Sequence, residues 1–136
     1  MATRSVTDSV SGAPAPVSRR GVIGTDEIGG LWDLVEQSAQ LRPELVILAD
    51  DHGRSLTAAQ FRDAAENAAA GLAERGVAAG DVVSWQLPTT LEAAVLMAAC
   101  ARLGAVQNPI IALLREREVE FMLEQVGTTL LIVPES

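Results

Sequence analysis

The sequence contains no lysine and no tyrosine, and it has a single histidine and a single cysteine. The lone cysteine, Cys100, excludes an intramolecular disulfide, and one cysteine with one histidine excludes a zinc site made of such ligands. We therefore expect no metal site, and a reducing cytoplasm as the location. No apolar run reaches the roughly 18 residues of a membrane span. Aromatic residues are few, so the core must consist of Ala, Val, Leu and Ile.

The charge is distributed unevenly along the chain. Residues 1–24 carry three arginines and one acidic residue, whereas the remaining residues carry seven arginines and seventeen acidic residues, a formal net charge of −10. Such an acidic surface repels phosphate backbones, so we expect no nucleic-acid partner. The first residues are also rich in Ser, Ala, Pro and Gly without any period. This composition predicts a disordered leader over residues 1–27 and a folded part over 28–136.

The first half of the folded part predicts two helices around a hairpin. Leu31, Leu34, Val35 and Leu41 recur at helical spacing, which predicts a helix over 31–41 with these residues on its buried face. An apolar run at 45–49, the turn Asp50-Asp51-His52-Gly53 and a return at 54–56 predict a β-hairpin.

The second predicted helix has the clearest start signal in the sequence. Thr57 and Gln60 are spaced as a capping box, and Leu56 with Phe61 matches a hydrophobic staple. Gly76 is suited to a left-handed position after the last helical turn.

The second half alternates short apolar runs with helical patterns. The predicted elements are a strand at 82–87, a buried helix at 90–103 that begins with a Thr89/Glu92 capping box, a strand at 106–111, an amphipathic helix from Arg115 to Gly127, and a strand at 129–133. Strands joined by helical crossovers indicate an α/β fold with a parallel sheet.

The predicted sheet is only partial. The run Thr129–Val133 is apolar on both faces, yet three residues follow it and no further helix can cover it. Parallel strands of this composition normally have both faces covered. We therefore expect an incomplete domain whose exposed sheet face associates with a second copy or with the remainder of a larger protein.

The signatures of a chemical site are missing. The sequence has no G-x-x-x-x-G-K-[ST] phosphate loop, no G-x-G-x-x-G motif and no G-x-S-x-G elbow. His52 and the acidic pair before it match turn chemistry, Cys100 lies among alanines as a buried thiol, and the charged run 115–118 matches a solvated first helical turn. The residues therefore predict no catalytic, cofactor-binding or metal-binding position.

Five segments, in order, resemble the adenylate-forming superfamily of acyl-CoA synthetases, luciferases and peptide-synthetase adenylation domains. They are the helix that begins Leu31-Trp-Asp-Leu-Val-Glu36 with the hairpin after it, Arg54-Ser-Leu-Thr-Ala-Ala-Gln-Phe61, Gly76-Val-Ala-Ala-Gly-Asp-Val-Val83, Ala94-Val-Leu-Met-Ala-Ala-Cys-Ala-Arg-Leu-Gly-Ala-Val106, and Asn108-Pro-Ile110 followed by Arg115-Glu-Arg-Glu-Val119. The last is most similar to fatty-acyl and cyclohexanecarboxylate CoA ligases. The resemblance covers residues 28–136 and implies the first portion of the large N-terminal domain of such a ligase.

This resemblance implies an activity for a whole enzyme, which uses ATP, Mg²⁺ and CoA to convert a carboxylate through an acyl-adenylate into a thioester. Family members carry the phosphate loop and a lysine-bearing C-terminal domain after the segment matched here, so we expect this chain to be inactive alone. Two alternatives to a ligase segment stay open. The first is a non-enzymatic module that pairs with a separately encoded remainder. The second is a small α/β domain that binds a ligand at the loops after Leu87 and Ile111.

Overall fold

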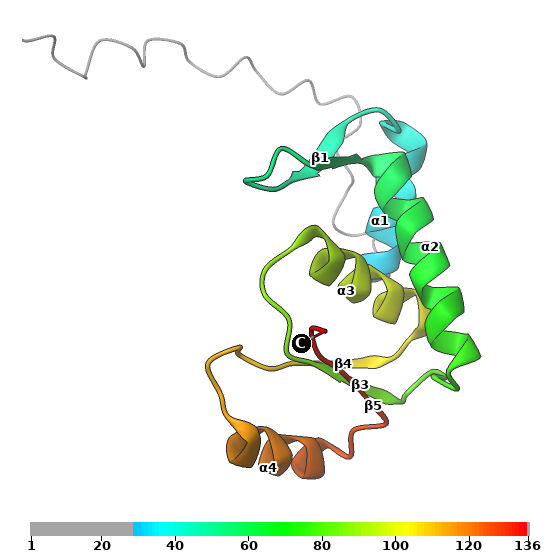
Figure 1. Cartoon of the computed structure of the whole chain (residues 1–136). Helices are drawn as coiled ribbons and strands as arrows, with labels where there is room; N and C mark the ends of the chain where they lie inside the picture. Colours follow the sequence, from blue (N-terminus) through cyan, green and yellow to red (C-terminus); the bar gives the residue numbers. More distant parts are fainter. Residues whose placement is uncertain (1–28, 136) are drawn as a thin grey trace, which may run out of the picture.

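The computed structural model describes residues 29–135 (Figure 1). The predicted leader at 1–27 lies outside the described residues. Within the described part, no helix is both long and apolar enough to cross a membrane.

The N-terminal half consists of two helices and a hairpin, as predicted. Helix α1 spans Leu31–Leu41, the antiparallel strands β1 and β2 span Val46–Ala49 and Ser55–Thr57, and α2 spans Ala58–Glu74. The capping box at the start of α2 is confirmed. The Thr57 backbone N–H donates to Gln60 Oε1 at 2.9 Å, and the Gln60 N–H donates to Thr57 Oγ1 at 3.2 Å.

Helix α2 ends in a glycine motif that directs the chain into the sheet. Gly76 has a φ of +88°, its N–H donates to the Ala73 carbonyl at 2.9 Å, and the Val77 N–H donates to the Leu72 carbonyl at 3.1 Å. This pair of bonds is a Schellman motif, and its two apolar partners, Leu72 and Val77, are both buried. The predicted role of Gly76 is therefore confirmed.

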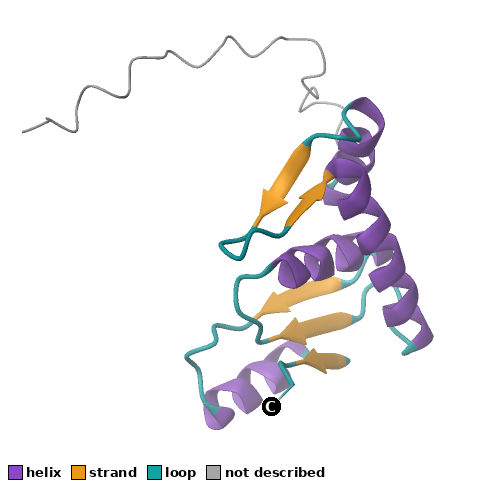
Figure 2. Ribbon diagram, turned by 45° about the horizontal axis from the view of Figure 1, so that its top comes forward, coloured by secondary structure: helices purple, strands orange, loops and turns teal. Residues whose placement is uncertain are grey.

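The C-terminal half is a three-stranded parallel sheet with the strand order β4-β3-β5. Its elements are β3 (Val82–Trp85), α3 (Leu91–Leu103), β4 (Val106–Pro109), α4 (Glu116–Val126) and β5 (Leu130–Ile132). The α/β class and the parallel pairing are confirmed, although each strand is shorter than predicted. Because the second crossover returns past β3, α3 and α4 lie on opposite faces of the sheet (Figures 1 and 2).

The main core lies between the sheet and the α2–α3 layer. Val83 and Trp85 of the central strand are buried there at 0% and 4% exposure, against Leu72, Leu96 and Cys100. A second cluster joins the first three helices. It contains Val35, Ala65 and Ala98, with Trp32 and Phe61 packed beside them. Small alanines at these contacts let the helices approach closely.

Two predicted apolar faces are wrong or incomplete. The burial predicted for Val35 of α1 is confirmed, but Leu31, Leu34 and Leu41 are exposed. Ala39 is the second buried residue of this helix, because α1 packs on the alanine-rich side of α2. Helix α4 lies on the second face of the sheet, which the sequence predicts to be bare, but Val119 is the only residue that this helix buries.

The predicted start of the buried helix is also wrong by one residue. Thr90, not Thr89, is the N-cap of α3, and its Oγ1 accepts a hydrogen bond from the Ala93 N–H at 3.3 Å. Glu92 is consequently outside any capping box, and its carboxylate binds an arginine of the hairpin instead.

Candidate functional site

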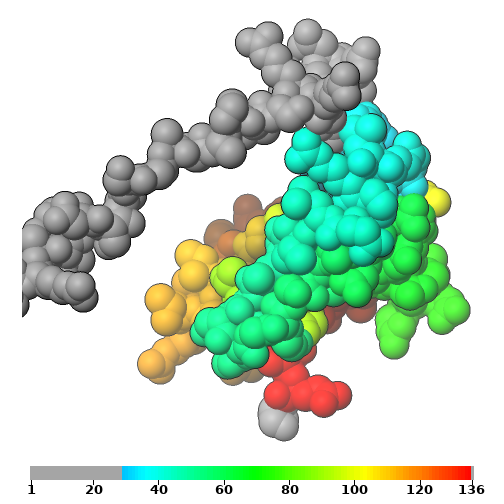
Figure 3. All heavy atoms as spheres, turned by 90° about the horizontal axis from the view of Figure 1, so that it is seen from above, coloured from blue at the N-terminus to red at the C-terminus, as the bar shows by residue number. Residues whose placement is uncertain are grey.

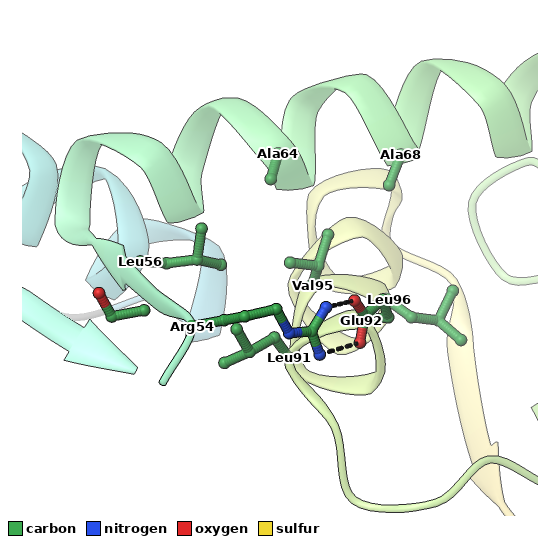
Figure 4. Close-up of a pocket in the computed structure, with 9 residues that line it drawn as sticks. Arg54, Leu56, Ala64, Ala68, Leu91, Glu92, Val95 and Leu96 are labelled. Atoms are coloured by element: carbon green, nitrogen blue, oxygen red, sulfur yellow. Dashed lines mark hydrogen bonds and ion pairs between the residues drawn. The ribbon is translucent and has the colours of Figure 1, made fainter. Parts of the chain in front are cut away.

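A pocket of about 580 Å³ lies between the hairpin, α2 and α3 (Figure 4). Ala64 and Ala68 point into it from α2, and Leu56 enters from β2. The start of α3 closes the opposite wall with apolar side chains. A volume of this size falls in the range of small-molecule sites. The complete lining is Arg54, Ser55, Leu56, Ala64, Ala68, Leu91, Glu92, Val95 and Leu96.

A charged network crosses the mouth of this pocket. Arg54 Nη1 and Nη2 donate to the two Glu92 oxygens at 2.5 and 3.3 Å, a bidentate pair drawn in Figure 4. Arg54 Nε donates to Asp50 Oδ2 at 2.6 Å. Asp50 Oδ1 in turn accepts the backbone N–H groups of His52 and Arg54. The network therefore fixes the hairpin turn and ties it to the first turn of α3.

The ionisation of these groups follows from the network. The hydrogen bond from Arg54 lowers the pKa of Glu92 to about 2, and the two acidic partners, Glu92 first, raise the pKa of Arg54. Burial opposes ionisation of Asp50, but hydrogen bonds from Arg54 lower its pKa on balance. All three groups are charged at neutral pH, so the network carries one positive and two negative charges, of which Arg54 and Glu92 line the pocket.

We expect the Arg54–Glu92 pair to stabilise the fold only above acidic pH. Because the pKa of Glu92 falls from an ordinary 4.5 to about 2 on folding, its contribution is complete above pH 4.5 and is lost as the pH drops towards 2. Urea unfolding of wild type and Glu92→Gln should show a difference in midpoint at pH 7 that shrinks steadily below pH 4.5. The Arg54→Gln background provides the control, since Glu92→Gln should there give a smaller pH-dependent difference once the partner that lowers the pKa of Glu92 is removed. A wild-type advantage that grows on acidification would contradict the assignment.

At the carboxyl ends of β3 and β4, a side chain after β3 is hydrogen-bonded to the loop that follows β4. Gln86, just after β3, donates through Nε2 to the Ile111 and Leu114 carbonyls at 3.0 and 2.8 Å. In open α/β sheets, ligands bind at this edge between strands whose helices lie on opposite faces. Here the amide of Gln86 connects the two loops that one sequence hypothesis assigns to a ligand, and it fixes the course of the second loop.

A polar cluster lies on the α4 side of the sheet. Ser84 is fully buried, its Oγ accepts from Asn108 Nδ2 at 2.9 Å, and it lies 2.7 Å from Thr128 Oγ1 in a further hydrogen bond. No buried side-chain polar atom in the described part lacks a partner. The cluster links β3 and β4 to the segment that precedes β5.

The residues that the sequence singles out remain apart. His52 is exposed in the hairpin turn, where its Nε2 lies 3.6 Å from Asp51 Oδ1. Cys100 is buried in α3, and burial raises the pKa of its thiol to about 11. Glu118 caps α4 by accepting the Arg115 N–H at 3.1 Å. Residues 29–135 contain no group of three His, Cys, Asp or Glu side chains placed to hold a metal ion.

The sequence does not indicate the long-range contacts that Arg54, Glu92 and Gln86 make. Arg54 and Glu92 are 38 residues apart, and no local pattern indicates that a hairpin turn meets the start of α3. Gln86 similarly reaches across 25 residues to Ile111. Only the placement of the elements brings these groups together.

Comparisons with known proteins all point to one family. The sequence profile described as AMP-binding enzyme matches residues 35–136. A curated relative, the medium-chain fatty-acid–CoA ligase of Escherichia coli K12, is 28% identical over 120 residues, which are 88% of this chain and 21% of that protein. The chain thus spans about a fifth of the length of this relative.

Solved structures give the same result. The Mycobacterium tuberculosis fatty acyl CoA synthetase superposes with a TM-score of 0.73 at 31% identity, over 75% of this chain and 20% of that one. The Klebsiella oxytoca NpsA N-terminal subdomain, in complex with 3-hydroxyanthranilyl-AMSN, superposes with a TM-score of 0.75 at 25% identity, over 79% of this chain and 28% of that one.

Proposed function

The chain belongs to the AMP-binding enzyme family, and from that premise we propose that it is an N-terminal segment of an ATP-dependent, AMP-forming acyl-CoA ligase. The observation that carries this proposal is the family match, which covers nearly all of the described residues. The reaction would join a carboxylate to AMP with release of pyrophosphate, and then transfer the acyl group to the thiol of CoA with release of AMP.

The proposed role of residues 28–136 within such a ligase is structural. Adenylation requires cationic groups, backbone N–H donors and Mg²⁺ around the phosphates. The described residues present a hydrogen-bonded polar cluster around Ser84, a network in which Arg54 is paired with Asp50 and Glu92, and a largely apolar pocket. We therefore assign no catalytic, ATP-binding, Mg²⁺-binding or CoA-binding residue to this segment, and we propose a cytoplasmic location for it.

The proposed partner surface is the sheet. Helix α4 buries only Val119, and β5 has a neighbour on one side only among the described strands. Both features leave apolar surface that the rest of a ligase domain would cover. A separately encoded remainder would use the same surface, which keeps the non-enzymatic pairing module as the second candidate function.

An assay of AMP release tests the function. The purified chain, given ATP, Mg²⁺, CoA and a panel of carboxylic acids, should form no AMP. Mixing it with the purified remainder of a medium-chain ligase, expressed without its matching N-terminal segment, should restore AMP formation. The remainder alone and the remainder with an unrelated α/β domain serve as controls. Turnover by the chain alone would refute the structural role, and a mixture that never exceeds the controls would refute the assignment as a ligase segment.

A further inference from the structure

The hairpin 45–57 is attached to the helices at its base and at its tip. At the base, the Ala58 N–H in the first turn of α2 donates to the Leu45 carbonyl at 2.9 Å. At the tip, Arg54 donates to both carboxylate oxygens of Glu92 in α3. In the described part of the chain, this pair provides the only hydrogen bonds between the hairpin and α3. The position of the tip relative to α3 therefore depends on one ion pair.

The two strands of the hairpin pack weakly against the rest of the molecule. Neither β1 nor β2 contains a buried residue, and Val46 of β1 is 53% exposed. Leu56 of β2 is partly buried where it enters the pocket. Seen from above, the hairpin lies on the face of the molecule turned to the viewer (Figure 3). A two-stranded hairpin with so little packing is at best marginally stable in water, so this one depends on its two attachments.

The turn at the tip is held by its own hydrogen bonds. Asp50 Oδ1 accepts the N–H groups of His52 and Arg54 at 3.0 and 2.8 Å. The Asp50 N–H in turn donates to the Arg54 carbonyl at 2.9 Å. None of these bonds involves α3. When Arg54 releases Glu92, the turn therefore keeps its shape, and the movement takes place at the base of the hairpin.

We propose that the hairpin is a movable wall of the pocket, hinged at its base and latched to α3 by the Arg54–Glu92 pair. In the latched state, Leu56 of the hairpin and Val95 of α3 line the pocket of about 580 Å³ from two sides (Figure 4). When the latch opens, the hairpin swings away from α3 and the pocket widens. The helices keep their places, because α2 and α3 share the buried alanines of the second cluster. The pocket thus has two widths, which one ion pair selects.

The latch is weak compared with the contacts of the core. The side chains of Arg54 and Glu92 are 51% and 62% exposed, so water solvates both ions when they separate. Unfolding of the main core, by contrast, exposes Val83, which is fully buried in β3. The hairpin should therefore open many times for each unfolding of the whole chain. Because the pair is exposed, dissolved salt should weaken it further.

This inference is independent of the proposed ligase segment. The hinge and the latch consist of contacts among residues 45–92, all within the described part of the chain. A hairpin that opens only when the whole chain unfolds would overturn the latch and leave the AMP-release assay unaffected. Conversely, a chain that never supports AMP formation would leave the latch in place.

Native-state amide hydrogen exchange of the full chain, resolved by NMR, provides the first test. Amides of β1 and β2 should exchange faster than those of β3, and Glu92→Gln should speed hairpin exchange about threefold to fivefold, the upper range for an exposed ion pair. Glu66→Gln is the matched control, because Glu66 forms a similarly exposed pair with Arg102, at 3.1 Å between α2 and the end of α3. This control should leave hairpin exchange unchanged. Hairpin amides as slow as those of β3, or equal effects of the two glutamines, would overturn the proposal.

Two further comparisons test whether the ion pair itself is the latch. Added salt should speed hairpin exchange in wild type and have a much smaller effect in Glu92→Gln. In the Arg54→Gln background, Glu92→Gln should cause no further increase, because its partner is already absent. Equal salt effects, or additive effects of the two substitutions, would overturn the role of the pair.

Distances between spin labels test the hinge directly. Labels are attached at His52→Cys in the turn and Met97→Cys on α3, since both side chains are exposed and the buried Cys100 thiol stays unreactive. With Glu92 present, one main distance is expected, and Glu92→Gln should enlarge a longer-distance population at least about threefold. Labels at Ala70→Cys and Met97→Cys, which join α2 to α3, are the control and should give the same distances in both backgrounds. A hairpin distance that Glu92→Gln leaves unchanged would overturn the latch.

Discussion

Trp85→Ala should leave the chain only marginally folded in water at room temperature. Trp85 is 4% exposed on the central strand, with β4 on one side and β5 on the other, and it packs in the main core. Truncation of a buried tryptophan costs about 3–5 kcal/mol. Small domains have stabilities of only about 5–15 kcal/mol, and this short chain with a partly covered sheet belongs at the low end. The substitution therefore removes most of the free energy of unfolding.

Urea titration followed by far-ultraviolet circular dichroism measures this loss, with Trp32→Ala as the comparison. Trp32 is half-buried at the edge of the second cluster, where its ring lies 5.4 Å from the Arg102 guanidinium. Its truncation should cost clearly less, because solvent already reaches the ring. These are the only two tryptophans, so Trp32→Phe leaves Trp85 as a single fluorescence reporter of the core. Equal losses for the two alanine variants would contradict the central position of Trp85.

Most helices and strands could be predicted from the sequence, because the residues that begin and end them act on backbone groups close by in the chain. The Thr57–Gln60 capping box and the glycines at helix ends satisfy backbone groups within a few residues, so their spacing alone indicates where helices begin and end. Alternation of strands and helices then restricts the sheet to parallel pairing. The order of the strands, with β3 in the centre, could not be predicted in this way, because no single residue of the sequence specifies it.

Features that depend on distant contacts were missed or predicted incorrectly. The periodicity of α1 indicated an apolar face, but it did not indicate which neighbour would cover it, and Leu31 and Leu34 stayed exposed. Glu92 matched a capping position one residue out of register, while its true partner, Arg54, was 38 residues away. The pocket and its charge network could not be predicted either, because they also depend on residues that are far apart in the sequence. A site formed by three elements needs their arrangement in space.

Ala65→Leu should destabilise the fold by overpacking the junction of the first three helices. Ala65 is 0% exposed and touches the cluster that includes Val35 of α1 and Ala98 of α3. A leucine adds three carbon atoms where no space remains, so the helices must move apart or adopt strained rotamers. The cost of such overpacking is about 1–3 kcal/mol. The higher end applies here, because the added carbons would separate α2 from α1 and from α3 at once.

Ala70→Leu is the matched control for this prediction, since Ala70 is exposed on the same helix. Both substitutions exchange one strong helix former for another, so helix propensity contributes little to the difference between them. The control should stay within about 0.5 kcal/mol of wild type. Urea midpoints of the three proteins, compared at equal slope, isolate the packing contribution. Equal stabilities of Ala65→Leu and Ala70→Leu would mean that the helix junction has room for a leucine and that α1 is not closely packed on α2 and α3.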